Sequence, residues 1–128
     1  MTLKTPPQPD PWSFLPLSAQ QFEILLSLTG EERHGYGIIV DVAARTGGGV
    51  RLGTGALYTA IARLVELELI RETDRRDPAD ARRRFYTVTR LGQRVLAAET
   101  ARLESLLLNA RRKGVRPLPA HPSAKDRP

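Results

Sequence analysis

The sequence predicts a mainly α-helical fold with a small β-hairpin and a long final helix. Apolar residues recur at helical spacing in three short segments. Two runs rich in β-branched and aromatic residues follow them, and a leucine-rich helical pattern then continues to about residue 113. With 128 residues and 41% hydrophobic content, the chain has the size of one compact domain with flanking tails.

Composition limits the classes of function. The chain has no cysteine, which excludes disulfides and thiolate metal sites and fits a reducing cytoplasm. Its two histidines, His34 and His121, have no carboxylate at metal-ligand spacing, so we expect no metal and no cofactor. No apolar run approaches the roughly 18 residues that cross a bilayer, and no signal-peptide pattern opens the chain. We therefore expect a cytoplasmic protein without a membrane segment.

The charge indicates a polyanionic partner. The formal net charge is +6, but six basic residues and one acidic residue from Arg111 onward account for +5 of it. The remaining 110 residues carry 14 basic and 13 acidic groups, a balance of +1. The local arrangement of charge in the folded part must therefore decide what it binds.

The first helix is predicted to begin at Ser18, whose hydroxyl can cap the amide of Gln21. Most of the helix surface that follows is apolar, which is typical of a core helix. Glu23 and Ser27, four residues apart, are expected to form its one solvent-facing stripe.

The second and third helices are predicted at residues 35–45 and 55–67, and the glycine run 47–49 ends the second. The expected apolar face of the second helix consists of Tyr36, Ile39, Val40 and Ala43. That of the third helix consists of Leu57, Ala60, Ile61, Leu64 and Val65. The opposite face of the third helix carries small polar groups and one arginine.

Residues 69–73 and 84–88 are predicted to pair as a two-stranded hairpin with a basic loop. A final helix of roughly 37 Å is predicted from an N-cap at Thr89 to about residue 113. The chain then divides into a proline-rich extended arm at 1–16, a domain at 17–88, a helix at 89–113 and a basic disordered tail at 114–128. Trp12 and Phe14 are expected to dock the arm.

Three short helices followed by a hairpin is the order of a winged helix-turn-helix domain. In this fold the third helix enters the major groove of DNA, and the hairpin, or wing, lies along the backbone. The predicted DNA contacts on the third helix are Thr54, Gly55, Thr59 and Arg63. Alternatively, Thr54 is only the N-cap of this helix and Arg63 is only a solvated charge.

Two further groups are predicted to contact phosphates. Tyr58 lies near the start of the third helix and either donates its hydroxyl to a phosphate or only seals the hairpin. The densest basic cluster of the domain is Arg82, Arg83 and Arg84, with Arg75 and Arg76 across the loop. Three aspartates of the same loop reduce its net charge to +2. A cluster of this kind is often only a solvated face, but its position at the tip of the predicted wing favours phosphate contacts.

The same residues resemble the PadR family of transcriptional regulators over about residues 17–110. The shared motifs are His34-Gly35-Tyr36-Gly37-Ile38, Gly55-Ala56-Leu57-Tyr58 and Arg83-Arg84-Phe85-Tyr86. The resemblance implies a dimeric repressor on a palindromic operator, with the third helix as reader, the hairpin as wing and the last helix as dimer contact. The positions carried over from the family motif are Tyr36, Gly55, Tyr58, Arg83 and Arg84.

Two positions depart from the family pattern. Glu68 stands where the family commonly has glycine, and in a left-handed conformation Glu would cost about 1 kcal/mol more than Gly. Some short relatives stack flat aromatic drugs on a tryptophan of the last helix, which here contains no aromatic residue. Trp12 is predicted to anchor the arm, on its own core or on a partner subunit. We therefore predict no drug site, and a small-molecule effector of unknown identity is left open.

The last helix predicts a homodimer, because the core of one subunit can cover only its first turns. Its exposed seam, interrupted by Glu99, is expected to be Leu96, Leu103, Leu106, Leu107 and Ala110. Burying a leucine contributes roughly 1.5 to 3 kcal/mol, which favours self-association. The alternative is that the seam packs back against the first helix of the same chain.

The predicted function is sequence-specific binding of double-stranded DNA by a homodimeric transcription regulator, with repression at an inverted repeat as the expected outcome. The alternative is a winged helix adaptor that binds other proteins, although an adaptor has no need of arginines clustered at its wing. No Ser, His and carboxylate constellation or phosphate-cradling loop is present, so we predict no enzyme.

Overall fold

The computed structural model describes residues 8–119, and the outer parts of the predicted arm and tail lie outside them. A 3-10 turn, four α-helices and three short strands follow one another along this part of the chain. They are η1 (Pro11–Phe14), α1 (Ala19–Ser27), β1 (Arg33–His34), α2 (Gly35–Arg45), α3 (Thr54–Glu66), β2 (Ile70–Glu72), β3 (Phe85–Val88) and α4 (Arg90–Arg112). This order confirms the predicted mainly helical fold.

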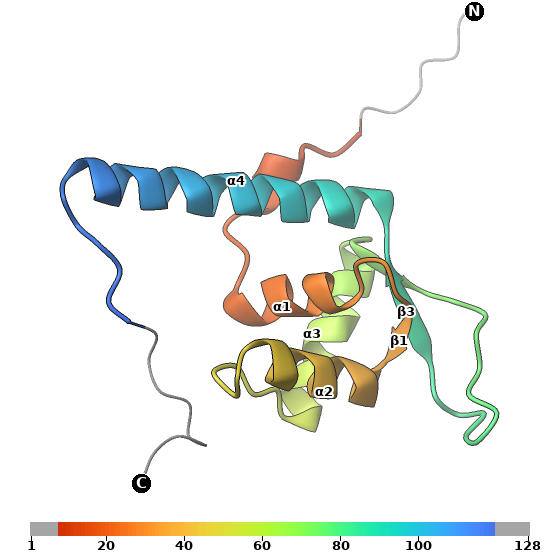
Figure 1. The fold of residues 1–128 in the computed structure, drawn as a ribbon. Helices are drawn as coiled ribbons and strands as arrows, with labels where there is room; N and C mark the ends of the chain where they lie inside the picture. The colour runs from red at the N-terminus through yellow and green to blue at the C-terminus, as the bar shows by residue number, and fades with distance from the viewer. Residues whose placement is uncertain (1–7, 120–128) are drawn as a thin grey trace, which may run out of the picture.

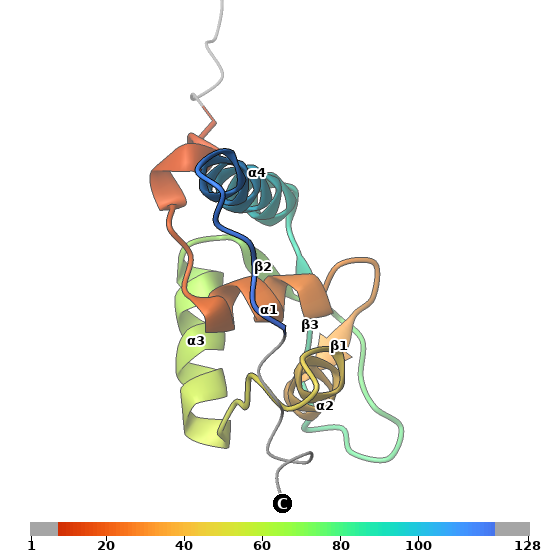
Figure 2. The same cartoon turned by 60° about the vertical axis from the view of Figure 1, so that its left-hand side comes forward.

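The helices form layers beneath α4. In Figure 1, α4 crosses the top of the molecule, α1 lies below it and α2 lies lowest. Figure 2 looks nearly along α4 and shows α1 between α4 above and α2 below, with α3 beside α1. None of the described helices has an apolar stretch long enough to cross a membrane.

In α1, α2 and α4, the side chain of the N-cap residue accepts a hydrogen bond from an amide of the first turn. The Ser18 hydroxyl accepts a hydrogen bond of 3.0 Å from the Gln21 amide, and the Gln21 side chain accepts one of 3.0 Å from the Ser18 amide, which confirms the predicted capping box. Thr89 caps α4 as predicted. α3 has Gly53 as its N-cap and no side-chain cap, so Thr54 is its first residue and not its cap.

The strands form one antiparallel sheet in the order β1-β3-β2. The predicted hairpin between β2 and β3 is confirmed, with Ile70 opposite Val88. The sequence missed β1, which pairs with β3 at only two positions, because a strand of two residues has no alternating pattern to recognise. Before β2, Glu68 has a φ of +62°, the left-handed conformation that was expected to favour glycine.

The core lies where α1, α2, α3 and the start of α4 meet. Its completely buried apolar residues are Ile24, Leu25, Leu28, Ile38, Val42, Leu57, Leu64, Leu69 and Val95. The predicted apolar face of α3 is confirmed at Leu57, Ile61 and Leu64, which are buried, and Ala60 packs partly against the core. Val65, predicted on the same face, is exposed. The predicted inner face of α2 was wrong, because Tyr36 and Val40 are exposed while Ile38 and Val42 are buried. α2 is apolar on most sides, so spacing alone could not decide which side faces inward.

The predicted solvent-facing stripe of α1 was also wrong, because α2 covers it. Ser27 is only 2% exposed, and its hydroxyl donates to Asp41 Oδ2 at 2.8 Å. Arg45 of α2 reaches back to the same place and pairs with Glu23 at 2.7 Å. Burial raises the pKa of Asp41, but hydrogen bonds from Arg45 and Ser27 outweigh this effect and hold the pKa below its usual value. The stripe is therefore a polar seam between two helices.

The N-terminal arm is partly structured. Residues Pro11–Phe14 form the turn η1, which packs on α4, whereas an extended arm was expected. Phe14 packs against the core as predicted, but the side chain of Trp12 is more than half exposed. Glu99 of α4 is 1% exposed and accepts hydrogen bonds from the Leu17 amide and from Arg102. This buried carboxylate ties the chain before α1 to α4.

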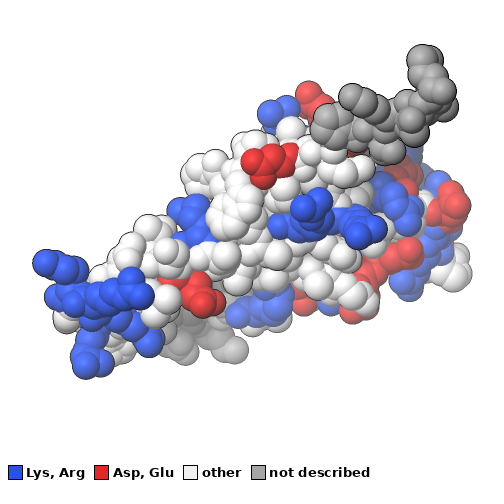
Figure 3. Space-filling view, turned by 90° about the horizontal axis from the view of Figure 1, so that it is seen from above, with Lys and Arg blue, Asp and Glu red and all other residues white. Residues whose placement is uncertain are grey.

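α4 belongs to the core over its first half only. Gly92 allows the close approach, since a Cβ atom there would lie 2.0 Å from the carbonyl oxygen of Leu69. The chain's own core covers α4 as far as Glu99, further than expected, and Leu96 is only 7% exposed. Leu96 therefore lies in the core of its own chain and not on the expected seam. Beyond Glu99 the helix projects past the other helices, and basic side chains gather at its end (Figures 1 and 3).

Candidate nucleic-acid interface

The start of α2, the side of α3 and the wing enclose a hollow of about 590 Å³. It is lined by His34, Gly35, Tyr36, Tyr58, Asp80, Arg82, Arg83, Arg84 and Tyr86. Five of these were predicted as DNA contacts from separate parts of the sequence, and the fold brings them together. Both Tyr36 and Tyr58 are more than half exposed.

The outward side of α3 continues from this hollow. The predicted contacts Thr54, Gly55, Thr59 and Arg63 are all exposed and lie on the side of α3 that faces away from the core. Within this set only Arg63 forms an ion pair, with Glu66 at 3.3 Å, and both side chains of this pair are largely exposed. Because the other three side chains are small, the helix can approach a groove closely with this face.

Gly35 is a residue of the hollow that the sequence did not single out as a contact. A Cβ atom on Gly35 would lie 2.8 Å from the Tyr58 hydroxyl oxygen, closer than such atoms come in real proteins. The missing side chain therefore lets Tyr58 of α3 place its hydroxyl over the first residue of α2. The signal in the sequence was the glycine of the His-Gly-Tyr motif. Tyr58 thus contacts α2 while about half of it stays exposed, and its contact with a phosphate stays a prediction.

The three wing arginines lie at the rim of the hollow and are paired with carboxylates. Arg84 Nη1 lies 2.9 Å from Glu72 Oε1, and Arg83 Nη1 lies 3.2 Å from Asp77 Oδ2. Arg82 is the most exposed of the three at 93% of its side chain, and its Nε lies 3.4 Å from Asp80. The guanidinium groups are thus placed for an anion, but each already has a negative partner.

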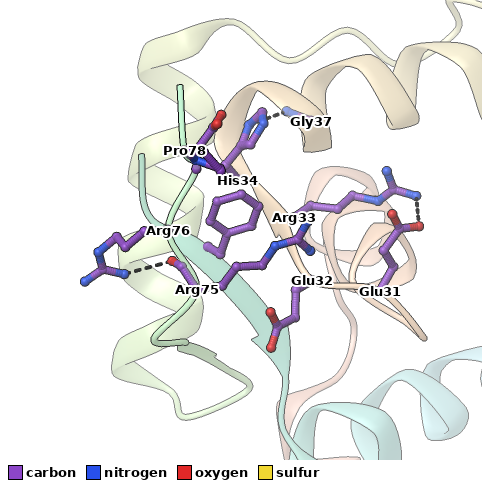
Figure 4. Close-up of a pocket in the computed structure, with 10 residues that line it drawn as sticks. Glu31, Glu32, Arg33, His34, Gly37, Arg75, Arg76 and Pro78 are labelled. Atoms are coloured by element: carbon purple, nitrogen blue, oxygen red, sulfur yellow. Dashed lines mark hydrogen bonds and ion pairs between the residues drawn. The ribbon is translucent and has the colours of Figure 1, made fainter. Parts of the chain in front are cut away.

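A second hollow, of about 260 Å³, lies on the other side of the wing (Figure 4). Glu31 and Arg33 line one wall, and Arg75 and Pro78 of the wing line the other. At its base, the Arg75 guanidinium stacks 4.6 Å above the ring centre of Phe85. These contacts hold the wing loop against the sheet. Within residues 8–119, no three His, Asp or Glu side chains lie close enough together to hold a metal ion.

His34 connects the wing to α2. Its Nδ1 accepts a hydrogen bond of 3.0 Å from the Gly37 amide, while its Nε2 lies 3.1 Å from Arg83 Nη1. Its ring also packs edge-on against Phe85, with the ring centres 5.2 Å apart. Burial, followed by the positive charge of Arg83, lowers the pKa of His34 below its usual value of 6.5, although Asp77 opposes this effect. The neutral ring is therefore the form that caps α2.

The pH dependence of stability tests this cap. Because the pKa of His34 is lower in the folded chain than in the unfolded chain, its contribution is complete above pH 6.5 and is lost as the pH falls through the folded-state pKa. We expect His34→Asn, which keeps a cap acceptor without a titrating charge, to flatten the fall in stability as the pH drops from about 7.5 to about 5.5. Urea unfolding at a series of pH values measures this, and identical profiles for the two proteins would contradict it.

Comparison with known proteins identifies the family. Residues 24–98, more than half of the chain, match the transcriptional regulator PadR-like family. The chain belongs to this family. It is a PadR-like transcriptional regulator, as its helix and wing motifs indicated. Among curated protein sequences, none matches the chain.

Solved structures of PadR-like and other regulators share the fold. A PadR family transcription regulator from Clostridium difficile R20291 is 20% identical, with a TM-score of 0.64 over 75% of this chain and 98% of that one. A transcriptional regulator from Clostridium thermocellum is 23% identical, with a TM-score of 0.62 over 76% of this chain and 90% of that one. RosR from H. salinarum is 24% identical, with a TM-score of 0.58 over 77% and 86%. These similarities establish the winged helix fold.

Proposed function

We propose that this PadR-like regulator binds double-stranded DNA sequence-specifically, as a homodimer on an inverted repeat, and represses transcription. The observation that carries the proposal is the hollow shared by α2, α3 and the wing, where two exposed tyrosines and three arginines meet beside the outward face of α3. An adaptor that binds only proteins would leave this grouping of arginines and hydroxyls without a role.

Each part of this surface has a different task in the proposed complex. Thr54, Thr59 and Arg63 on the exposed side of α3 would read base edges in the major groove. The Tyr36 and Tyr58 hydroxyls, next to the positive end of the α2 dipole, suit a phosphate oxygen. The wing arginines would follow the neighbouring phosphates, which position the protein without specifying a sequence.

The proposed dimer uses the half of α4 that projects from the domain. Leu103, Leu106 and Leu107 are 41 to 52% exposed, and they continue the side of α4 that is buried at Val95 and Glu99. Because about half of each leucine is already covered, each would contribute roughly 1 kcal/mol on association, less than a fully exposed leucine. Ala110 extends the same side, whereas Leu96 is left out. Two copies would place two α3 helices on half-sites about one helical turn of DNA apart.

A selection from randomised duplex DNA tests the function directly. The purified protein is incubated with a random pool at about physiological salt, and the bound duplexes are sequenced. We expect an inverted repeat to be enriched, because two symmetric copies read two half-sites. A folded protein that enriches no sequence would contradict specific operator binding.

The salt dependence of binding tests the wing. We expect Arg83→Ala with Arg84→Ala to weaken binding to every duplex and to reduce the slope of log K against log salt by roughly 2, because two phosphate contacts are lost. Arg90→Ala with Arg94→Ala, on the exposed surface of α4, removes the same charge and serves as the control. If both double variants change the slope equally, the wing does not contact the backbone.

The oligomeric state tests the seam. We expect Leu103→Glu with Leu107→Glu to give a monomer in light scattering, because four charges would meet in the dimer. Ser105→Glu with Asn109→Glu has the same spacing and charge on another side of α4, and it should stay dimeric. A Leu103→Glu, Leu107→Glu protein that remains dimeric would place the interface elsewhere.

A further inference from the structure

The wing carries its own anions at the positions where the proposed function needs phosphates. Asp77 pairs with Arg83 at 3.2 Å, and Asp80 pairs with Arg82 at 3.4 Å and with Arg83 at 4.0 Å. Surface ion pairs of this kind contribute little to stability. Their stronger effect is on the electrostatic potential that an approaching polyanion meets.

Backbone amides hold these two carboxylates, whereas the arginine side chains that pair with them are more exposed. Asp77 Oδ1 accepts a hydrogen bond of 2.8 Å from the Ala79 amide, and Asp80 Oδ1 accepts one of 3.0 Å from the Arg82 amide. The aspartate side chains are 19% and 34% exposed, compared with 41% for Arg83 and 93% for Arg82. The carboxylates are therefore less exposed than the guanidinium groups, and backbone amides hold them in the turn.

A backbone hydrogen bond and nearby arginines favour the charged form of Asp80. The amide of Arg82, by its hydrogen bond, lowers the pKa of Asp80 below the usual value, and the Arg82 and Arg83 side chains add to this effect. Asp77 lies beside Arg83 and next to His34, which is neutral in this fold. Because each arginine lies 3.2 to 3.4 Å from an aspartate, a phosphate bound by Arg82 or Arg83 would have a negative charge within a Debye length of about 8 Å.

We propose that Asp77 and Asp80 act as a built-in brake on sequence-independent DNA binding. The inference rests on the proposed function and adds a regulation of the same surface. Phosphate contacts supply essentially all of non-specific affinity, and each carboxylate weakens the contact made through its arginine. Within a screening length of about 8 Å, the repulsion reduces affinity about threefold for each carboxylate.

The two carboxylates weaken the phosphate contacts of the wing, so a larger share of the binding free energy comes from α3. The residues of α3 that face the bases are not paired with Asp77 or Asp80, so sequence reading is not weakened by them. A regulator must leave the very large number of competing random sites in a genome, and a lower general affinity assists that release. The opposite role is that the two carboxylates hold the arginines ready for phosphate, and the experiment separates the two roles.

The test uses a double variant of the whole chain that carries both Asp77→Asn and Asp80→Asn. Its binding is compared with that of the unaltered protein. Asparagine keeps the side-chain oxygen that accepts the turn amides but removes the charge. Binding is measured by fluorescence anisotropy with a random-sequence duplex at about 100 mM salt. We expect roughly tenfold tighter binding, with the gain shrinking as the salt concentration rises. Asp80→Asn alone should give about threefold and serves as the test if the double variant does not fold.

The control has the same change in net charge on the far side of the molecule. It combines Asp10→Asn at the start of η1 with Glu104→Gln on α4, both at exposed positions. If the Asp77, Asp80 variant binds no tighter than this control, or more weakly than the unaltered protein, the brake is overturned while DNA binding stands. If the unaltered protein and every variant fail to bind any duplex, the proposed function falls and the brake falls with it.

Discussion

The pairing of β1 with β3 is the constraint on which the candidate site depends. His34 lies opposite Phe85 and Arg33 opposite Tyr86, so the first residue of α2 is held beside the root of the wing. From this position His34 caps α2 with one ring nitrogen and faces Arg83 with the other. If these two residues did not pair, α2 and the wing would share no fixed boundary, and the hollow between them would not form.

Charge on this surface is balanced locally. Although the chain has a net charge of +6, the wing arginines and Arg63 of α3 each lie within 4.0 Å of a carboxylate. The arginines of these pairs are 41 to 93% exposed, and surface ion pairs change stability by less than about 1 kcal/mol. They matter instead for recognition, because they decide how much of each arginine's charge a phosphate meets.

α4 joins two environments in a single helix. Its first half packs on the sheet and on α1, helped by Gly92, which lets the helix approach the Leu69 carbonyl. At Glu99 the helix leaves the core, and the same carboxylate also holds the chain that leads into α1. The position of α4 is therefore fixed from both sides before its leucines project from the domain. A rigid projecting helix would transmit the geometry of a dimer to the two α3 helices.

The sequence alone determined the elements whose signals are local. Caps such as Ser18 and Thr89 act within one turn, and the apolar side of α3 and the β2 and β3 runs are patterns of neighbouring residues. Tertiary structure decided what depends on distant partners. It buried Ser27 because Asp41 and Arg45 could satisfy its hydroxyl, and it turned Ile38 inward in place of Tyr36.

The candidate site divides in the same way. Residue types and motifs indicated the tyrosines, the α3 face and the wing arginines, because these groups are recognisable by chemistry and spacing. The pairing of each arginine with a particular carboxylate, the approach of Tyr58 to Gly35 and the removal of Leu96 into the core came only with the fold. Such contacts join residues that are far apart along the chain or lie across a loop, and no local pattern encodes which of several neighbours a side chain will meet.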